Sequence, residues 1–409
     1  MGCGACVPTC PEKALTMTDV RQQGLRPVVD SEKCKTCGEC LNVCPGIEIT
    51  DHSSEPAAIA ELSQSWGNVL EVWEGYAQDS EIRYKSSSGG AVTALALYCL
   101  ENKEASNVLH IGSSPENPLQ NTVFLSKSRQ ELIARIGSRY SPAAPCEKLD
   151  WIRYNRESCV LIGKPCDIVA LRKSQKQNEQ LCEKINLSIS IFCAGTPATE
   201  GTYNILEKLK VNAEQVEKFR YRGYGWPGMT DVKVKGSEDG TKQLSYQQSW
   251  GEILSKYTQF RCRLCPDSTG QLADISCGDP WYRQIGDDEK GFSLLLVRTE
   301  RGREILHRAA ENGYLKLERT TWDTVPRSQK ALLERRRHLW GRLLMLRLMG
   351  IPVPRYTGFD LFNNWLELGL TEKIRSFCGT FKRIIIRQWT KPIKALSSRD
   401  LSRTTALKK

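Results

Sequence analysis

The sequence contains no run of 18 apolar residues, and no apolar segment of the kind that directs secretion follows Met1. The first absence predicts a chain without a transmembrane helix. The second disfavours a secreted scaffold in which the 17 cysteines would pair as disulfides. We therefore expect reduced thiols, several of them metal ligands, in a cytoplasmic protein.

Histidine is also scarce, and none of the four histidines stands out as an acid–base catalyst. His52 falls in a predicted linker, His110 in a predicted strand, and His307 and His338 in predicted helices. The sequence therefore assigns no catalytic residue.

Acidic residues are few in the last part of the chain. From Lys330 to Lys409 there are 18 Lys and Arg against 5 Asp and Glu, so residues 1–329 carry a net charge of −2 although the whole chain carries +11. This distribution disfavours nucleic acid as a partner. The basic tail has two explanations: a helical cap docked on the main domain with a solvated basic face, or peripheral association with an anionic membrane or an acidic partner.

What is present is a chain of 409 residues with 40% hydrophobic composition, enough to bury the cores of two or three domains. Its first strong signal is the run Cys34, Cys37, Cys40 and Cys44 followed by Pro45. Gaps of two, two and three residues before a proline are typical of bacterial ferredoxins, in which the fourth cysteine binds a neighbouring cluster. A second motif is therefore expected.

That second motif is Cys3, Cys6 and Cys10 with Pro11, and it is one cysteine short, because the counterpart of Cys34 would precede Met1. Two such motifs predict a ferredoxin-like two-cluster domain over residues 1–51, and the repeated spacing argues against a zinc ribbon. The missing ligand leaves three readings of the site: a three-iron cluster, a four-iron cluster with a non-protein ligand, or a late start codon, which we favour.

The crossed-ligand rule divides these cysteines into two sets. The four-cysteine set is Cys10, Cys34, Cys37 and Cys40. The three-cysteine set is Cys3, Cys6 and Cys44.

Residues 52–68 form a polar predicted linker, and alternating strands and helices then predict an α/β core over residues 69–329. Within it, Ser86, Ser87, Ser88, Gly89 and Gly90 precede a predicted helix over 91–101. Backbone amides at a helix N-terminus attract anions, so the loop suits the phosphate of a nucleotide cofactor, although a Ser-rich turn with a simple helix cap has the same pattern.

Two cysteines follow predicted strands of this core. Cys166 comes after a strand over 159–163, at the start of a predicted helix over 168–174, and Cys193 comes after a strand over 187–192. Open α/β sheets carry their chemistry at such strand ends, and a helix N-terminus stabilises a thiolate. The pair Cys262 and Cys265 suits zinc, a redox disulfide or a cluster, and with Cys166 and Cys193 it would complete a four-thiolate core set.

Six short motifs lie in order along the core: K-S-S-S-G-G at Lys85 to Gly90, G-S-R-Y at Gly137 to Tyr140, G-K-P-C at Gly163 to Cys166, F-C-A-G at Phe192 to Gly195, F-R-Y-R-G at Phe219 to Gly223, and C-R-L-C-P-D with L-A-D-I-S within 262–276. Together they resemble the coenzyme F420 hydrogenase/dehydrogenase beta subunit family over about residues 70–327. Arg139 stands where the family more usually has lysine.

The resemblance implies an iron–sulfur flavoprotein: a flavin-binding α/β (α+β) core between the ferredoxin-like domain and the basic helical extension at 330–409. It implies FAD held by Ser86 to Gly90 and by Ser138, Arg139, Tyr140 and Lys164. It also supports a 4Fe-4S cluster on the core set, in addition to one intact ferredoxin-type site and one that lacks a cysteine.

The function expected from this machinery is electron transfer between ferredoxin, or F420, and a small-molecule substrate that takes two electrons. The alternative is an electron-transfer subunit of a larger complex without a substrate site of its own. A second copy of the chain is a further candidate partner. A zinc protein whose cysteines only support a basic binding tail is the third reading.

Overall fold

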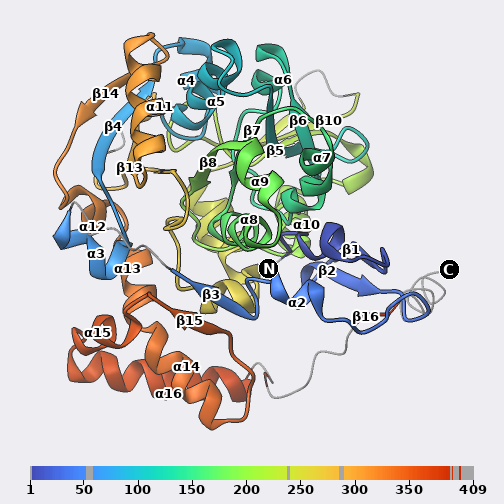
Figure 1. Cartoon of the computed structure of the whole chain (residues 1–409), viewed down its shortest axis with the longest axis vertical. Helices are drawn as coiled ribbons and strands as arrows, with labels where there is room; N and C mark the ends of the chain where they lie inside the picture. Colours follow the sequence, from blue (N-terminus) through green and yellow to red (C-terminus); the bar gives the residue numbers. More distant parts are fainter. Residues whose placement is uncertain are drawn as a thin grey trace.

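An eight-stranded mixed sheet organises the middle of the chain (Figure 1). The computed structural model describes residues 2–51, 59–236, 240–284, 290–386, 389 and 396–397. The strands, in their order across the sheet, are β14 (Leu315–Arg319), β4 (Glu71–Ala77), β13 (Ser293–Val297), β12 (Ile275–Gly278), β8 (Ile185–Ile191), β7 (Cys159–Gly163), β5 (Asn107–Ser113) and β6 (Asn121–Ser126).

Strands β12, β8, β7 and β5 run parallel, while β13, β14 and β6 are antiparallel to their neighbours. Because β4 is antiparallel to β13, it runs in the same direction as β12. The carboxyl ends of five strands, β4, β5, β7, β8 and β12, therefore meet at one edge of the sheet. Loops that follow these strands are brought together there although they are far apart in the sequence.

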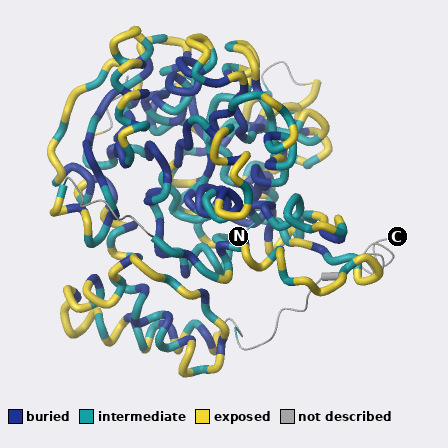
Figure 2. The backbone as a smooth tube through the Cα atoms, viewed as in Figure 1, coloured by how far each residue is buried: buried dark blue, intermediate teal, exposed yellow. Residues whose placement is uncertain are grey.

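Helices cover both faces of the sheet, so the strands read as nearly continuous apolar runs. Helices α5 (Ala91–Glu101) and α11 (Glu300–Glu311) pack on the face that carries Val108 and Val160. Helices α7 (Leu149–Tyr154) and α8 (Pro165–Gln177) pack on the face that carries Leu109 and Leu161. Successive residues of one strand thus enter two different cores, and the buried backbone lies at the centre of the molecule (Figure 2).

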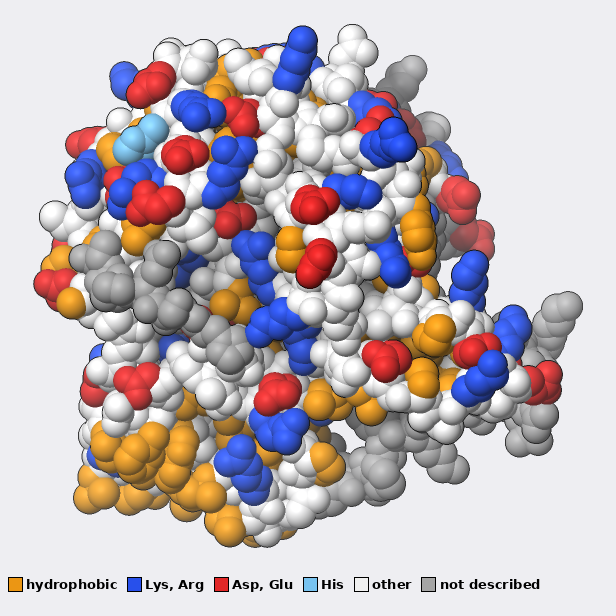
Figure 3. Space-filling view, viewed as in Figure 1, with side chains coloured by type: hydrophobic (Ala, Val, Ile, Leu, Met, Phe, Trp, Pro, Cys, Tyr) orange, Lys and Arg blue, Asp and Glu red, His pale blue; other side chains and the backbone are white. Residues whose placement is uncertain are grey.

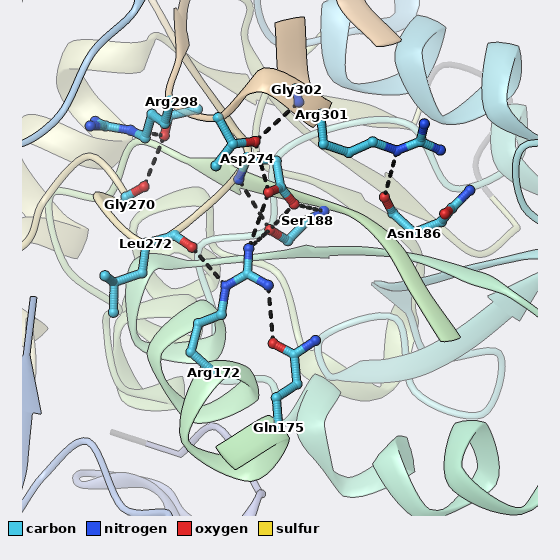
Figure 4. A network of polar contacts seen from close by, with 12 residues as sticks. Arg172, Gln175, Asn186, Ser188, Gly270, Leu272, Asp274, Arg298, Arg301 and Gly302 are labelled. Atoms are coloured by element: carbon cyan, nitrogen blue, oxygen red, sulfur yellow. Dashed lines mark hydrogen bonds and ion pairs between the residues drawn. The ribbon is translucent and has the colours of Figure 1, made fainter. Parts of the chain in front are cut away.

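A polar network ties the strands to the helices near the sheet centre (Figure 4). Arg172 of α8 donates from Nη2 to Ser188 Oγ at 2.9 Å and to Asp274 Oδ1 at 3.2 Å. Asp274 Oδ2 also accepts from the Ser188 amide at 2.7 Å, and Thr299, which caps α11, donates to Asp274 Oδ1 at 3.0 Å. One carboxylate therefore fixes β8, α8 and α11 relative to β12.

The N-terminal residues form a small domain that docks on this core. It contains α1 (Cys6–Thr9), the hairpin of β1 (Leu15–Val20) and β2 (Gly24–Val29), α2 (Glu39–Asn42) and β3 (Glu48–Thr50). The amide of Cys146 donates to the carbonyl of Cys3 at 2.9 Å, and Lys173 Nζ donates to the carbonyl of Cys44 at 3.3 Å. Both contacts place cysteine loops of this domain directly against the core.

A second, three-stranded sheet lies beside the large one. It consists of β9 (Val216–Arg220), β10 (Thr230–Val234) and β11 (Thr241–Leu244), and it shares a small core with α10 (Thr199–Leu209). The arginine- and glycine-rich sequence of residues 219–228 predicts a loop, but the segment begins inside β9 and leaves the strand only after Arg220.

The C-terminal part is helical and packs on the core. It contains α12 (Thr324–Ser328), α13 (Lys330–Arg337), α14 (Leu339–Leu348), the short strand β15 (Arg355–Thr357), α15 (Leu361–Leu366) and α16 (Leu370–Ile386). Arg336 is buried and donates to the carbonyls of Pro266, Gln64 and Phe359 at 3.3, 3.1 and 2.7 Å. The described helices of the basic tail therefore dock on the core through buried contacts.

Several predicted elements differ from the observed ones. The leucines and arginines of residues 332–347 predict one amphipathic helix, but the structure divides this segment at His338 into α13 and α14. Residues 60–66, predicted as linker, form α3 (Ala60–Trp66), because Leu62 and Trp66 are buried against the sheet; residues 52–58 of that linker lie outside the described residues. Helix α8 begins at Pro165, three residues earlier than predicted. Among the described residues, no helix is both long and apolar enough to span a membrane.

Candidate functional site

A pocket with a cavity volume of about 290 Å³ opens at the carboxyl edge of the large sheet. Its walls come from the loops after β4, β7, β8 and β12 and from the segment that precedes the core domain's helix α7. Of the nine predicted cofactor-binding residues, these eight line it: Ser86, Ser87, Ser88, Gly90, Ser138, Arg139, Tyr140 and Lys164. Gly89 instead packs on the sheet, where a Cβ would lie 2.5 Å from the carbonyl oxygen of Gly75.

One end of the pocket is suited to an anion. Helix α5 begins there after Gly90, whose φ of 81° is left-handed, and no side chain caps the helix. Residues 91–93, whose amides are free of helical partners at this position, line the pocket. Ser87 Oγ accepts from the Ser138 amide at 2.7 Å and so joins the two predicted phosphate-binding loops. Free amides and the helix dipole together favour a phosphate group.

The two predicted cations have other partners. Arg139 donates from Nε to Asn121 Oδ1 at 2.6 Å and from Nη1 to the carbonyl of Phe219 at 2.7 Å, while its Nη2 reaches the carbonyls of Pro118 and Gln120. Burial lowers the pKa of Arg139. Its guanidinium therefore holds β6 and β9 together, and a role on phosphate stays a prediction.

Lys164 lies between the pocket and the core cysteines. Its Nζ donates to Asp167 Oδ2 at 2.7 Å, and the Lys164 amide donates to the same oxygen at 2.9 Å. Burial by itself lowers the pKa of Lys164, but Asp167 and Cys166 offset this, and the pKa rises above its ordinary value. Lys164 is thus a fixed positive charge at the border of the pocket.

Sequence reasoning missed a buried ion pair in the pocket wall. Arg222 donates to Asp279 Oδ1 at 2.8 Å and to Oδ2 at 3.0 Å, and the indole of Trp226 donates to Asp279 Oδ1 at 2.7 Å. Tyr246 stacks on Trp281 with ring centroids 5.1 Å apart and forms an aromatic wall next to the pair. The signal was available in part, because Arg222 belongs to the F-R-Y-R-G segment and Asp279 directly follows the end of β12.

The core cysteines lie on separate elements that the fold brings together. Cys166 is the second residue of α8, Cys193 follows β8, and Cys262 and Cys265 flank the end of a short 3-10 helix over 260–264. Burial raises the pKa of Cys193 to about 11, and Cys262 adds to the rise. Burial also raises the pKa of Cys265, with Asp267, Cys193 and Cys262 as further causes. Cys193 itself lines the pocket.

The expected stabilisation of a Cys166 thiolate by its helix is outweighed. Burial raises the pKa of Cys166, and the negative charges of Asp167, Cys3 and Cys193 add to the increase. The same neighbours show that Cys166 lies near both the core set and the N-terminal domain. A bound metal ion would reverse this rise of the Cys166 pKa, because a thiol that coordinates a metal ion loses its proton.

The N-terminal cysteines lie near one another, and Cys40 of the four-cysteine set is also a neighbour of Cys6. Burial raises the pKa of Cys40, and the thiols around it that add to the rise are Cys10, Cys37 and Cys34. Burial raises the pKa of Cys6 to about 12, with Cys3 and Cys44 as the next causes. Cys3 also lies near Asp167 of the core, and Cys37 is exposed. Solvent therefore reaches the four-cysteine set, and the three-cysteine set faces the core.

Among the described residues, no three His, Cys, Asp or Glu side chains converge on the position of a single metal ion. In a four-iron cluster each thiolate binds its own iron, so the ligands surround a cage and do not meet at one point. The ligand type, several neighbouring thiols, is the one that iron–sulfur clusters use.

Comparisons with known proteins agree with this arrangement. The family model for the N-terminal part of the coenzyme F420 hydrogenase/dehydrogenase beta subunit matches residues 72–149, and the model for its C terminus matches residues 156–322. The chain belongs to the coenzyme F420 hydrogenase/dehydrogenase beta subunit family. A 4Fe-4S dicluster domain model matches residues 1–46, which confirms the predicted iron–sulfur domain ahead of the family's core.

Curated relatives are about a quarter identical to this chain over the aligned residues. The coenzyme F420 hydrogenase subunit beta of Methanococcus voltae is 26% identical over 304 residues, which cover 71% of this chain and 99% of that subunit. The coenzyme F420-dependent sulfite reductase of Methanocaldococcus jannaschii is 28% identical over 316 residues, 69% of this chain and 46% of that protein. The chain thus spans about half the length of the sulfite reductase.

Two further proteins are similar to this chain. The F420-dependent formate dehydrogenase subunit beta of Methanocaldococcus jannaschii is 26% identical over 247 residues, 59% of this chain and 60% of that subunit. A chain of the F420-reducing [NiFe] hydrogenase complex from Methanosarcina barkeri superposes with a TM-score of 0.49 at 19% identity, over 80% of this chain and 95% of that one. The named relatives in this family are parts of F420-dependent oxidoreductases.

Proposed function

We propose that this protein is an iron–sulfur flavoprotein oxidoreductase that passes electrons between a ferredoxin-like donor, or reduced F420, and a substrate that takes two electrons. The observation that carries the proposal is the succession of cysteine sets. Solvent reaches the four-cysteine set at Cys37, the three-cysteine set adjoins the core at Asp167, and Cys193 of the core set lines the pocket. Electrons could therefore enter at the exposed four-cysteine set and pass through the cysteine sets to the pocket.

The proposed cofactors are 4Fe-4S clusters on the cysteine sets and FAD in the pocket. The clusters supply one-electron transfer, and the flavin converts between one and two electrons when bound. Residues 86–90 and the first turn of α5 would hold the FAD pyrophosphate, and the wall of Tyr246 and Trp281 would exclude water from the ring. Lys164 would hold a positive charge beside the bound group.

The FAD proposal is tested with a charge at the first turn of α5. Thr93 is the third residue of α5, half-buried, and lines the pocket. Thr93→Asp adds a carboxylate where a phosphate would bind, whereas Thr93→Asn has the same shape without the charge. A carboxylate in the first turn stabilises an empty helix, so loss of fold is not expected. Flavin released by denaturation is measured for both variants and for the parent chain.

We expect the Asn variant to keep most of its flavin and the Asp variant to lose most of it, with iron content unchanged in both. A purified chain that carries its full iron and no flavin would overturn the FAD assignment. Oxidation of reduced ferredoxin, or of reduced F420, by the loaded protein in the presence of an acceptor then identifies the donor.

The second candidate function is an electron-transfer subunit without a substrate site of its own. It is favoured by the relatives whose names describe beta subunits of hydrogenases and formate dehydrogenases. The two functions differ in one assay. Turnover by the single purified chain supports the complete enzyme, whereas turnover only after a second polypeptide is added supports the subunit.

A further inference from the structure

The C-terminal helices carry an exposed apolar surface that no described part of the chain covers. Half of the 16 large hydrophobic residues exposed in the described chain lie between Leu348 and Ile386. Figure 3 shows apolar side chains gathered over this region, at the lower left. We call six of these residues the C-terminal apolar patch: Phe362, Leu366, Leu370, Ile374, Phe381 and Ile385. Such concentration marks an interaction surface, because single exposed apolar residues elsewhere need no explanation.

Helix α16 has two distinct apolar or small-residue faces. Ser376, Thr380 and Ile384 are buried and face the neighbouring helix α14. Leu370 and Ile374, which are 74% and 54% exposed, lie with Phe381 and Ile385 on another side. At about 100° per residue these four side chains fall within roughly 60° of one another. The stripe is therefore continuous along the helix and is left open to the outside.

Positive charges border this stripe. Arg375 and Lys382 are exposed along one edge, and Lys373 lies on the other, with its Nζ 5.3 Å from the ring centre of Trp365. On α16 the only carboxylate is Glu372. Residues 330–386 as a whole contain 11 Lys and Arg against 4 Asp and Glu. The patch is therefore complementary to a surface that is apolar within and negative around it.

Aromatic packing holds the patch in shape. Trp340 of α14 contacts Phe362 and Trp365 of α15 with ring centroids 4.9 and 4.7 Å apart, and Trp365 Nε1 donates to Ser376 Oγ of α16 at 3.1 Å. Glu367, which directly follows α15, is paired with Arg337. Half-buried tryptophans at the edge of an apolar surface are typical of the boundary between lipid and water.

We propose that the C-terminal apolar patch binds the surface of an anionic membrane, with α16 lying in the plane of the interface. The apolar stripe enters the boundary of the acyl chains, and Lys373, Arg375 and Lys382 contact the phosphates of the lipid headgroups. Lipid is favoured over a protein partner because lysines border the stripe on both sides, and lysine is depleted in protein interfaces. This inference is independent of the proposed electron transfer, because it concerns where the enzyme is held.

The test measures partition of the cofactor-loaded full chain onto vesicles. Vesicles of phosphatidylcholine are compared with vesicles that contain about 30% phosphatidylglycerol, at low and high salt. The variant Leu370→Ser/Ile374→Ser removes the N-terminal half of the stripe, and Arg375→Glu/Lys382→Glu reverses the charge along one of its edges. The matched controls are Tyr154→Ser, at a residue 72% exposed on α7, and Lys208→Glu/Lys218→Glu, two exposed lysines far along the chain.

We expect binding to the anionic vesicles that weakens with salt, a loss of roughly tenfold or more in each patch variant, and no change in the controls. Unchanged iron content and thermal midpoint show that a variant has kept its fold. The proposal is overturned if the parent chain binds neither vesicle, if it binds both equally, or if the patch variants bind as the parent does. A patch variant that instead loses a stoichiometric protein partner while vesicle binding is absent identifies a protein interface.

Discussion

Arg222 and Asp279 face each other across the pocket wall with two hydrogen bonds, Nη2–Oδ1 at 2.8 Å and Nη1–Oδ2 at 3.0 Å. Arg222 is 2% exposed, and its Nε donates to the carbonyl of Pro227 at 2.6 Å. Its guanidinium also reaches the carbonyl of Ser87 in the phosphate loop. One residue of the segment after β9 therefore connects the end of β12 to the start of α5.

Asp279→Asn should be strongly destabilising. The change leaves Arg222 buried without its counter-charge, and breaking one side of a buried pair costs about 3 kcal/mol or more. We expect a large drop of the thermal midpoint together with lower flavin retention. Asp323→Asn removes one side of an exposed pair with Arg327 and should leave the midpoint unchanged. Equal midpoints for the two variants would contradict the role given to the buried pair.

Gly302→Ala tests the close approach of α11 to β12. A Cβ on Gly302 would lie 2.3 Å from the carbonyl oxygen of Asp274. Because this oxygen belongs to the backbone, relieving the clash requires a shift of the helix or of the strand. Overpacking of this kind costs about 1–3 kcal/mol or more. Gly369→Ala is the control, because no atom lies within 4 Å of its added Cβ. We expect chemical denaturation to show a clearly lower free energy of unfolding for Gly302→Ala and an unchanged one for Gly369→Ala.

Cys40→Ala should remove the cluster of the four-cysteine set and spare the flavin. The variant is expected to lose about four iron atoms per chain and to stop oxidising its donor, because the proposed entry point is gone. Cys182→Ala is the control, since Cys182 is exposed and lies in none of the sets. Iron analysis and flavin release measure both effects. Unchanged iron in the Cys40 variant would refute the assignment.

The stability of the core should depend on pH through His110. Burial lowers the pKa of His110 to about 4, with Arg135 as the next cause, from an ordinary value of 6.5. Between these two pH values the unfolded chain binds a proton that the folded chain does not. The free energy of unfolding should therefore fall as the pH falls, by at most about 1.4 kcal/mol per unit.

His110→Gln removes this titration and keeps a donor for Ser126, to which His110 Nε2 is bonded at 2.8 Å. The thermal midpoint of the parent chain should fall more than that of the variant between about pH 7 and about pH 5. Parallel pH profiles for the two proteins would show that His110 is not the group responsible.

Local patterns predicted much of the fold. The strand over 159–163 and the helix over 91–101 were predicted with the bounds they have, because their apolar residues are contiguous and their flanks carry Gly, Lys–Pro or Asn. The linker was predicted too long, since Leu62 and Trp66 become a helical face only against the sheet. The single helix over the basic tail was wrong at His338, where the burial of Arg336 and Leu339 on different neighbours divides it.

The sequence by itself determined the candidate ligands of metal and phosphate, because cysteine spacing and a Ser/Gly-rich turn before a helix are patterns of a few neighbouring residues. Only the tertiary structure decided what these groups meet. Cys193 lies near Cys262, and Arg222 pairs with Asp279. Arg139 donates to the carbonyl of Phe219. Each of these contacts joins residues more than 50 positions apart. Such contacts follow from the order of strands in the sheet, which no local pattern encodes.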